Sequence, residues 1–190
     1  MPETVAAQRL DARRNREAVI ESAIELLSAN PNASMQQIAD ASGVGRTTVY
    51  RHFPNRDDLF RALFERIVAE ARAVTGAITS GSAGTEEVLR ELAPAMIALG
   101  LRFRFLHSHR EVGRPALQRS KEVEDEPVAR YLAAGQERGE IRTDLPIQWM
   151  RSLIQAMAVA AMDDLHAGHF DEATAAGLLG DSMVAVLLAR

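Results

Sequence analysis

Apolar residues recur at helical spacing along almost the whole chain, and no segment alternates apolar and polar residues as a half-buried strand does. The first helix is predicted over 11–29, where Asn30-Pro31-Asn32 ends it. One face of this helix is apolar and consists of Val19, Ile20, Ala23, Ile24 and Leu27. The pattern therefore predicts an all-α fold.

Two short helices are predicted next. Ser34 and Gln37 have the spacing of a capping box, in which the serine hydroxyl accepts from the glutamine amide and the glutamine side chain reaches back. Gly43 ends this helix, because glycine adopts positive φ at little steric cost. The following helix is predicted from Gly45 to Phe53. Two short helices joined by a glycine turn are typical of a helix-turn-helix motif.

The second of these helices is anchored on one side only. Val49 and Phe53 lie four residues apart and face the core, and Pro54 ends the helix. The other positions are polar: Arg46, Thr47, Thr48, Tyr50, Arg51 and His52. These side chains carry the donors and hydroxyl groups that contact bases and phosphates in a DNA major groove. From the pattern alone, a solvated helical corner that binds nothing stays an alternative.

Helices are also predicted for the rest of the chain. A long helix from 55 to about 79 carries Leu59, Phe60 and Leu63 on its inner face. A stretch rich in glycine, serine and threonine, 76–84, marks where it ends. The later helices are predicted over 85–100 with an interruption at Pro94, over 127–134, from 146 to about 168, and from 171 to the C-terminus.

Composition and charge narrow the function. The chain has no cysteine, which excludes disulfides, thiolate metal sites and a cysteine nucleophile. Its net charge of −4 argues against a protein that coats nucleic acid indiscriminately, although it leaves room for a local basic surface. The N-terminus has no apolar signal segment and no apolar run is long enough to span a membrane, so we expect a cytoplasmic protein with no membrane partner.

The run SMQQIADASGVGRTTVYRHFPNRDDLFRALF closely resembles the N-terminal domain of TetR-family transcriptional regulators. The resemblance covers roughly residues 10–64 and includes the glycine-valine turn and the Thr-x-Tyr-x-His-Phe helix. It implies an N-terminal three-helix helix-turn-helix domain, 1–54, joined by a long connector helix to a helical ligand-binding and dimerisation domain, both within 55–190. The chain departs from the family at Gly45, where many relatives have a serine that caps the helix.

The resemblance also implies which residues contact DNA. Arg46 and Thr47 would read base edges, with Gln36 as a further base contact. The implied phosphate contacts are Ser34, Thr48, Tyr50, His52 and Arg56. Three more arginines, Arg9, Arg13 and Arg14, lie near the N-terminus. They either follow the DNA backbone or enter the minor groove, or they belong to a solvated arm.

Methionine and aromatic side chains lie on helical faces of the C-terminal two thirds. With one leucine, the set is Met96, Phe103, Phe105, Tyr131, Trp149, Leu153 and Met157. By pattern alone these residues form an ordinary core. The resemblance implies a ligand cavity among the middle helices, where such side chains would suit a small lipophilic effector. A polar anchor would then come from Arg102, Arg104, His107 and Gln155.

No other chemistry is indicated. The sequence has no nucleophile elbow, phosphate loop or dinucleotide fingerprint, so we predict neither an enzyme nor a bound cofactor. His107 and His109 are two residues apart and would point to different sides of a helix, which is unfavourable for a metal site. For Asp163, His166 and His169, interaction with a helix C-terminus is a simpler explanation than a metal.

The sequence thus predicts a sequence-specific transcriptional regulator, a repressor that leaves a palindromic operator on double-stranded DNA when a small lipophilic effector binds. A homodimer is predicted through the last two helices, which carry more apolar surface than one packed face needs. Its seam would contain Leu153, Leu178, Leu179 and Val186, with Ala158, Ala160 and Ala161 permitting close approach. Two alternatives stay open: an effector-independent architectural DNA-binding protein, and a helical carrier or enzyme with a vestigial helix-turn-helix motif.

Overall fold

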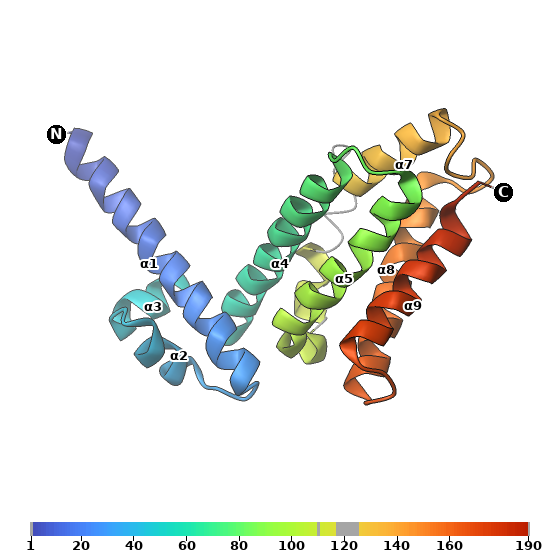
Figure 1. The fold of residues 1–190 in the computed structure, drawn as a ribbon. Coiled ribbons are helices and arrows are strands. Elements are labelled where there is room, and N and C mark those ends of the chain that lie inside the picture. The colour runs from blue at the N-terminus through green and yellow to red at the C-terminus, as the bar shows by residue number, and fades with distance from the viewer. Residues whose placement is uncertain (1, 110, 117–125, 190) are drawn as a thin grey trace. The chain divides into compact units, whose positions relative to one another are not determined.

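A computed structural model describes residues 2–109, 111–116 and 126–189 (Figure 1). Regular structure in these residues is helical, apart from one isolated antiparallel bridge between Ile141 and Leu188. The named elements are α1 (Pro2–Ala29), α2 (Met35–Ser42), α3 (Arg46–His52), α4 (Arg56–Thr79), α5 (Thr85–Arg102), the 3₁₀ helix η1 (Arg104–His109), α7 (Pro127–Glu137), α8 (Ile147–His166) and α9 (Glu172–Leu187). The predicted all-α fold is confirmed.

The described residues form two compact units. The first unit contains the chain up to Arg66 together with Arg102–Ala116, and the second contains Ile67–Leu101 together with the chain from Glu126 onward. Helix α4 runs without a break from the first unit into the second. The functional boundary predicted after residue 54 stays a prediction, because packing alone does not assign function.

The first unit is built around the apolar face predicted for the first helix. α1 packs against α2 and α3, and all five residues of that face are exposed by 3% or less. Ile38, Val49 and Phe53 add almost completely buried side chains from α2, α3 and the residue after it. Aromatic rings extend this core: Phe60 of α4 meets Phe105 of η1 edge to face, with ring centroids 6.3 Å apart. The first unit therefore has an aliphatic core that includes a group of aromatic rings in defined geometry.

Two features of the predicted helices are wrong, and α7 also ends later than predicted, at Glu137 rather than at residue 134. α1 begins at Pro2 rather than at residue 11, and Figure 1 shows its first turns extending beyond α2 and α3. Residues 3–10 contain good helix formers but no apolar stripe, so periodicity alone missed this part. α5 runs from Thr85 to Arg102 without a break at Pro94. Pro94 is exposed, so its ring meets solvent rather than a packed helix, and α5 continues past the missing backbone donor.

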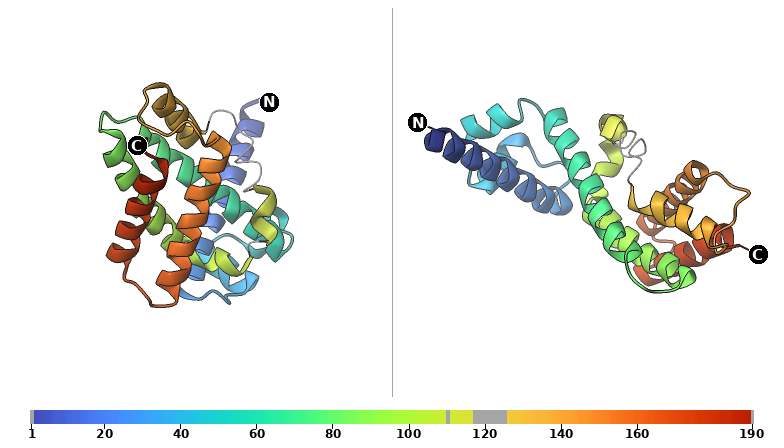
Figure 2. Two further views of the ribbon diagram at one scale, coloured as in Figure 1. Left: turned by 90° about the vertical axis from the view of Figure 1, so that its right-hand side faces the viewer. Right: turned by 90° about the horizontal axis from the view of Figure 1, so that it is seen from above.

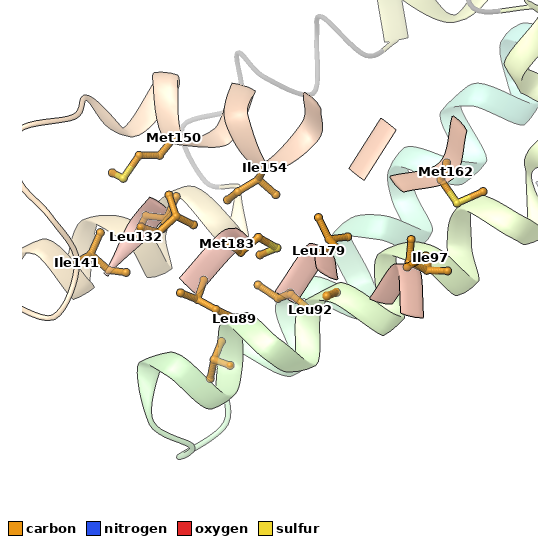
Figure 3. Close-up of a cluster of buried hydrophobic side chains, with 14 residues drawn as sticks. Leu89, Leu92, Ile97, Leu132, Ile141, Met150, Ile154, Met162, Leu179 and Met183 are labelled. Carbon is orange, nitrogen blue, oxygen red and sulfur yellow. The ribbon is translucent and has the colours of Figure 1, made fainter. Parts of the chain in front are cut away.

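The second unit is held together by aliphatic and methionine side chains. Figure 3 shows them meeting from α5, α7, α8 and α9, together with Ile141. α8 and α9 lie side by side and antiparallel (Figures 1 and 2). Backbone hydrogen bonds fasten the end of α9: Arg142 N donates to Leu187 O at 3.0 Å, and Ala189 N donates to Glu140 O at 2.9 Å. These bonds attach the C-terminal end of α9 to the segment that precedes α8.

Candidate nucleic-acid interface

Local hydrogen bonds define the turn between α2 and α3. α2 begins with the predicted capping box: Gln37 N donates to Ser34 Oγ at 3.2 Å, and Ser34 N donates to Gln37 Oε1 at 2.8 Å. It ends at Gly43, whose φ of 65° lies in the left-handed region. Ser42 Oγ then accepts from Val44 N at 3.2 Å. These contacts set the direction in which α3 leaves the turn.

α3 has one buried side and one exposed side. Val49 is fully buried, and Phe53 just after the helix is 2% exposed. The guanidinium carbon of Arg16 on α1 lies 5.4 Å from the centre of the Phe53 ring. On the other side, Thr48 is half-buried while Arg46, Thr47, Tyr50 and Arg51 are exposed, as is Gln36 on α2. The predicted base-reading residues are therefore accessible to a partner.

Arg46, a predicted base-reading residue, is paired with Asp40 of α2. Arg46 Nε donates to Asp40 Oδ1 at 3.2 Å, and Arg46 Nη2 lies 3.1 and 3.2 Å from Oδ1 and Oδ2. Both side chains are more than half exposed. The pair spans the turn, so it ties the orientation of Arg46 to α2 as well as to α3. The sequence reasoning missed Asp40; the available signal was a carboxylate six residues before an arginine, across a glycine turn.

Two of the predicted phosphate contacts already serve the fold. The Ser34 hydroxyl accepts the capping hydrogen bond at the start of α2, although the residue is exposed. The Arg56 guanidinium donates to the carbonyl oxygens of Ala33 and Pro31, and it lies over the Phe60 ring at 4.8 Å. Arg56 therefore fastens the start of α4 to the loop before α2. The sequence pattern did not indicate this structural role.

The surroundings of His52 disfavour a charged imidazole. The residue is half-buried, and its Nε2 atom is buried with no hydrogen-bond partner among the described residues. Burial lowers the pKa of His52 below its usual 6.5, and the positive charges of Arg51 and Arg16 lower it further. These effects favour the neutral imidazole, which is a weaker phosphate ligand than a charged one.

The seven predicted ligand contacts are divided between the two units. Phe103 and Phe105 lie in the core of the first unit, 2% and 3% exposed, and Arg102 and Arg104 of the predicted polar anchor belong to the same unit. In the second unit, Trp149 is 55% exposed. Half-buried positions there are occupied by Met96, Tyr131, Leu153 and Met157. Periodicity could not show that the chain after α5 returns to the first unit. The assignment of the seven residues to a ligand site stays a prediction.

A surface hollow of about 540 Å³ lies in the second unit, at the turn between α4 and α5. Tyr131, one of the predicted ligand contacts, lines it and donates its hydroxyl to Thr85 Oγ1 at 3.3 Å. Thr85 Oγ1 in turn donates to Glu140, whose carboxylate also pairs with Arg138. Hydrogen bonds from Arg138 and then Thr85 lower the pKa of Glu140 below its usual range. The polar wall of the hollow is thus a connected network of charged and neutral groups.

His109 and His169 contact an aromatic ring and a carboxylate, respectively. The described residues contain no cluster of three or more metal-binding side chains. The ring of His109 lies on Phe60, with centroids 3.9 Å apart, and His169 Nδ1 lies 3.0 Å from Asp164 Oδ1. The side chain of His107 falls outside the described residues.

The length and apolar character of the described helices bear on whether any of them could span a membrane. Within 2–109, 111–116 and 126–189, no helix has both the length and the apolar character needed to cross a bilayer. The most apolar helix, α9, has Asp171 and Glu172 at its start and Asp181 in its body. One side of this helix, with Ala175, Leu179, Met183 and Leu187, packs in the core of the second unit.

A known protein family matches the part of the chain that includes the turn between α2 and α3. Residues 19–63 match the family described as bacterial regulatory proteins, tetR family. This range begins at the buried face of α1 and ends inside α4, so it contains the capping box, the glycine turn and the whole of α3.

Similarity to individual proteins extends well beyond the turn. The chain is 31% identical to the HTH-type transcriptional repressor LfrR of Mycolicibacterium smegmatis over 158 residues, 80% of this chain and 82% of that protein. The crystal structure of LfrR from Mycobacterium smegmatis in complex with proflavine is similar with a TM-score of 0.68 and 25% identity, covering 90% of this chain and 94% of that one. The fatty acid degradation regulator FadR from Bacillus halodurans has a TM-score of 0.71 and 16% identity, with coverage of 90% and 94%.

Proposed function

The chain belongs to the tetR family of bacterial regulatory proteins and is a transcriptional regulator, and from that premise we propose that it is a repressor whose first unit binds a specific DNA operator. The observation that carries the proposal is the division of α3 between a buried side, Val49, and an exposed polar side. A helix anchored in this way can enter a major groove without disturbing its own core.

Base reading is assigned to the start of α3. Arg46 and Thr47 are its first two residues and both are exposed. In helix-turn-helix proteins, the N-terminal residues of the second helix contact base edges. Gln36, exposed on α2, adds a base contact in this proposal. Arginine can bind guanine with two hydrogen bonds, and glutamine can bind adenine in the same manner.

Phosphate binding is assigned to hydroxyl groups around the motif. Ser34 and Tyr50 are exposed and Thr48 is half-buried, which supports their contact with the DNA backbone. The assignment of His52 to phosphate binding has weaker support, because its environment favours a neutral ring and its Nε2 atom is buried. The assignment of Arg56 to phosphate binding also has weaker support, because its guanidinium donates to two backbone carbonyls of its own unit.

We propose that two chains associate through α8 and α9. Leu178 of α9 is 46% exposed, although leucine side chains are usually buried. Ala160 of α8 is exposed and would let a partner helix approach closely, whereas Ala158 and Ala161 pack partly against the core of their own unit. The dimer would present two copies of α3 to one duplex, so the operator would be palindromic. Leu178→Glu should then give a monomer in light scattering at micromolar concentration, and a monomeric wild-type protein would exclude this interface.

We further propose that a small lipophilic effector releases the repressor from DNA. The relative LfrR has been solved in complex with proflavine, and the methionine-rich packing of this second unit can adapt to a guest. α4 is continuous from the second unit into the first, which offers a route for coupling. The effector reduces operator binding only if it binds the DNA-incompetent state more tightly than the competent one.

Coupling between effector and operator can be measured directly with proflavine. Its affinity for the protein is determined with and without operator DNA, and reciprocity requires the operator to weaken proflavine binding by the factor by which proflavine weakens operator binding. We expect a coupling of about 1–3 kcal/mol. Equal proflavine affinities with and without operator would exclude release by this compound.

Selection of bound sequences from a random DNA pool tests the central proposal. We expect a motif with two related half-sites whose centres are about 10 base pairs, or a multiple of that, apart. Binding to DNA without any enriched motif would favour an architectural protein, and a chain that retains no DNA at all would contradict the proposal.

A further inference from the structure

The ion pair between Asp40 and Arg46 joins the two helices of the motif on their exposed side. Nε and Nη2 of the guanidinium face the carboxylate through three contacts of 3.1–3.2 Å. The two side chains are 55% and 56% exposed, and an exposed pair of this kind adds little to stability. The main consequence of the pair is therefore the orientation of the guanidinium.

The backbone on both sides of this pair is well anchored. Asp40 follows Ile38 and Ala39, which are 0% and 2% exposed, so its Cα position is set by the core. Gly43 in the left-handed region connects α2 to α3. Arg46 is the first residue of α3 and precedes the fully buried Val49 by three positions. The carboxylate is thus held at a defined place beside a long, flexible arginine side chain.

The contact uses one edge of the guanidinium and leaves another free. Guanidinium has five N–H donors in a planar fork. Asp40 accepts from Nε at one oxygen and from Nη2 at both oxygens, whereas Nη1 makes no contact with the carboxylate. The edge formed by Nη1 and Nη2 has the spacing that matches O6 and N7 of guanine, and Nη1 is the part of this edge that faces away from Asp40. An arginine already held in this plane loses less conformational freedom when it binds a base.

The negative charge of Asp40 lowers the affinity for DNA in general, whereas its contact with Arg46 favours one base. A carboxylate on the DNA-facing side repels phosphates, and this repulsion does not depend on the base sequence. Asp40 therefore lowers affinity for every sequence, while its contact with Arg46 favours one base. Affinity and discrimination should respond with opposite sign when the carboxylate is removed, which separates a positioning role from simple charge.

We propose that Asp40 is a positioning residue that holds Arg46 for the recognition of guanine in the operator, an inference that rests on the proposed DNA-binding function. Asp40 does not contact the base itself in this arrangement. Its effect on base preference passes through the Arg46 guanidinium, so it disappears when Arg46 is absent.

The experiment uses the full chain and the operator selected from the random pool. The position read by Arg46 is first located as the one whose preference is lost in Arg46→Ala. Discrimination there is the ratio of Kd for the A·T-substituted operator to Kd for the selected operator. We expect Arg46→Ala to lower this ratio roughly 5- to 150-fold. We expect Asp40→Ala to lower it roughly threefold to tenfold while affinity for unrelated DNA is unchanged or higher.

Two further variants control for charge and for the route of the effect. Asp57→Ala removes the same charge from an exposed position in the first turn of α4 and should leave the ratio unchanged. The double variant Asp40→Ala/Arg46→Ala should have the same ratio as Arg46→Ala alone. The thermal midpoint of each variant confirms that it is folded.

The outcomes separate this inference from the function on which it rests. An unchanged ratio in Asp40→Ala, or equal tightening on all sequences, would overturn the positioning role while operator binding stands. A ratio that falls equally at positions not read by Arg46 would overturn it as well. If the wild-type chain selects no operator, or if Arg46→Ala alters no preference, the base contact fails and the positioning role fails with it.

Discussion

The two units differ in the chemistry of their cores. The first unit contains five of the six phenylalanines, namely Phe53, Phe60, Phe64, Phe103 and Phe105. The second contains five of the seven methionines, namely Met96, Met150, Met157, Met162 and Met183. Aromatic rings pack in a few preferred arrangements, whereas unbranched thioethers fill irregular spaces by changing rotamer. The first unit is therefore suited to keeping one shape, and the second to accommodating change.

A methyl group added at a closely packed glycine should show the largest difference in stability between the units. At Gly113, a Cβ would lie 2.2 Å from Cδ1 of the Phe64 ring. At Gly100 of α5, the nearest atom would be Sδ of Met162 at 2.7 Å. We expect Gly113→Ala to lower the free energy of unfolding by about 1–3 kcal/mol, because the ring cannot fold away. Gly100→Ala should cost less than about 1 kcal/mol, because the thioether can shift.

Urea denaturation of both variants checks this prediction. A larger loss for Gly100→Ala than for Gly113→Ala would mean that the second unit is the more rigidly packed of the two, and the comparison would be reversed.

Replacing an arginine by alanine should change the free energy of unfolding by a smaller amount, which again differs between the units. Arg56 donates to two backbone carbonyls in the first unit, whereas Arg138 of the second unit is 46% exposed and pairs with Glu140. We expect Arg56→Ala to lower the free energy of unfolding by about 1 kcal/mol. Arg138→Ala should change it by less than about 0.5 kcal/mol, as for other exposed ion pairs.

The same denaturation assay distinguishes these arginines. If both substitutions have the same small effect, then the hydrogen bonds of Arg56 add nothing to the first unit, and its guanidinium would be as available to a phosphate as the sequence first suggested.

Lowering the pH should have the smallest effect on the free energy of unfolding. The pH range in which stability falls should differ between the two units. The pKa of His52 is below its usual 6.5 in the folded first unit, so the unfolded chain binds the proton more readily. The stability contributed by neutral His52 is present above pH 6.5 and is lost as the pH falls below that value. In the second unit, pairing lowers the pKa of Glu140 and Asp144 below 4.5 and 3.8, so their contribution persists until the pH falls through that lower range.

Urea midpoints measured between pH 7.5 and 5 test the histidine. His52→Gln should remove the part of the decline that begins near pH 6.5, whereas the decline at lower pH should remain. An identical pH profile in wild type and His52→Gln would show that burial of this imidazole has no consequence for stability.

Much of the helix-turn-helix was predictable because its determinants are local. Ser34, Gln37 and Gly43 act on residues within a few positions of themselves, and the structure has the capping box and left-handed glycine that their spacing indicated. Val49 and Phe53 were assigned to the buried side from helical spacing, and both are buried. By contrast, the start of α1 at Pro2 had no apolar stripe to mark it.

The sequence by itself determined the all-α class, the turn between α2 and α3, and which side of α3 is polar, because each depends on spacing within a few residues. Only the tertiary structure decided which partners distant side chains find. Periodicity shows that Phe103 and Phe105 are buried but not that Phe105 lies between Phe60 and Phe103, in ring contact with both. It shows that Arg46 and Arg56 are outward and basic, but not that one meets Asp40 and the other meets two backbone carbonyls. Those contacts depend on how the chain returns to itself in space, and residue spacing along the chain does not contain that information.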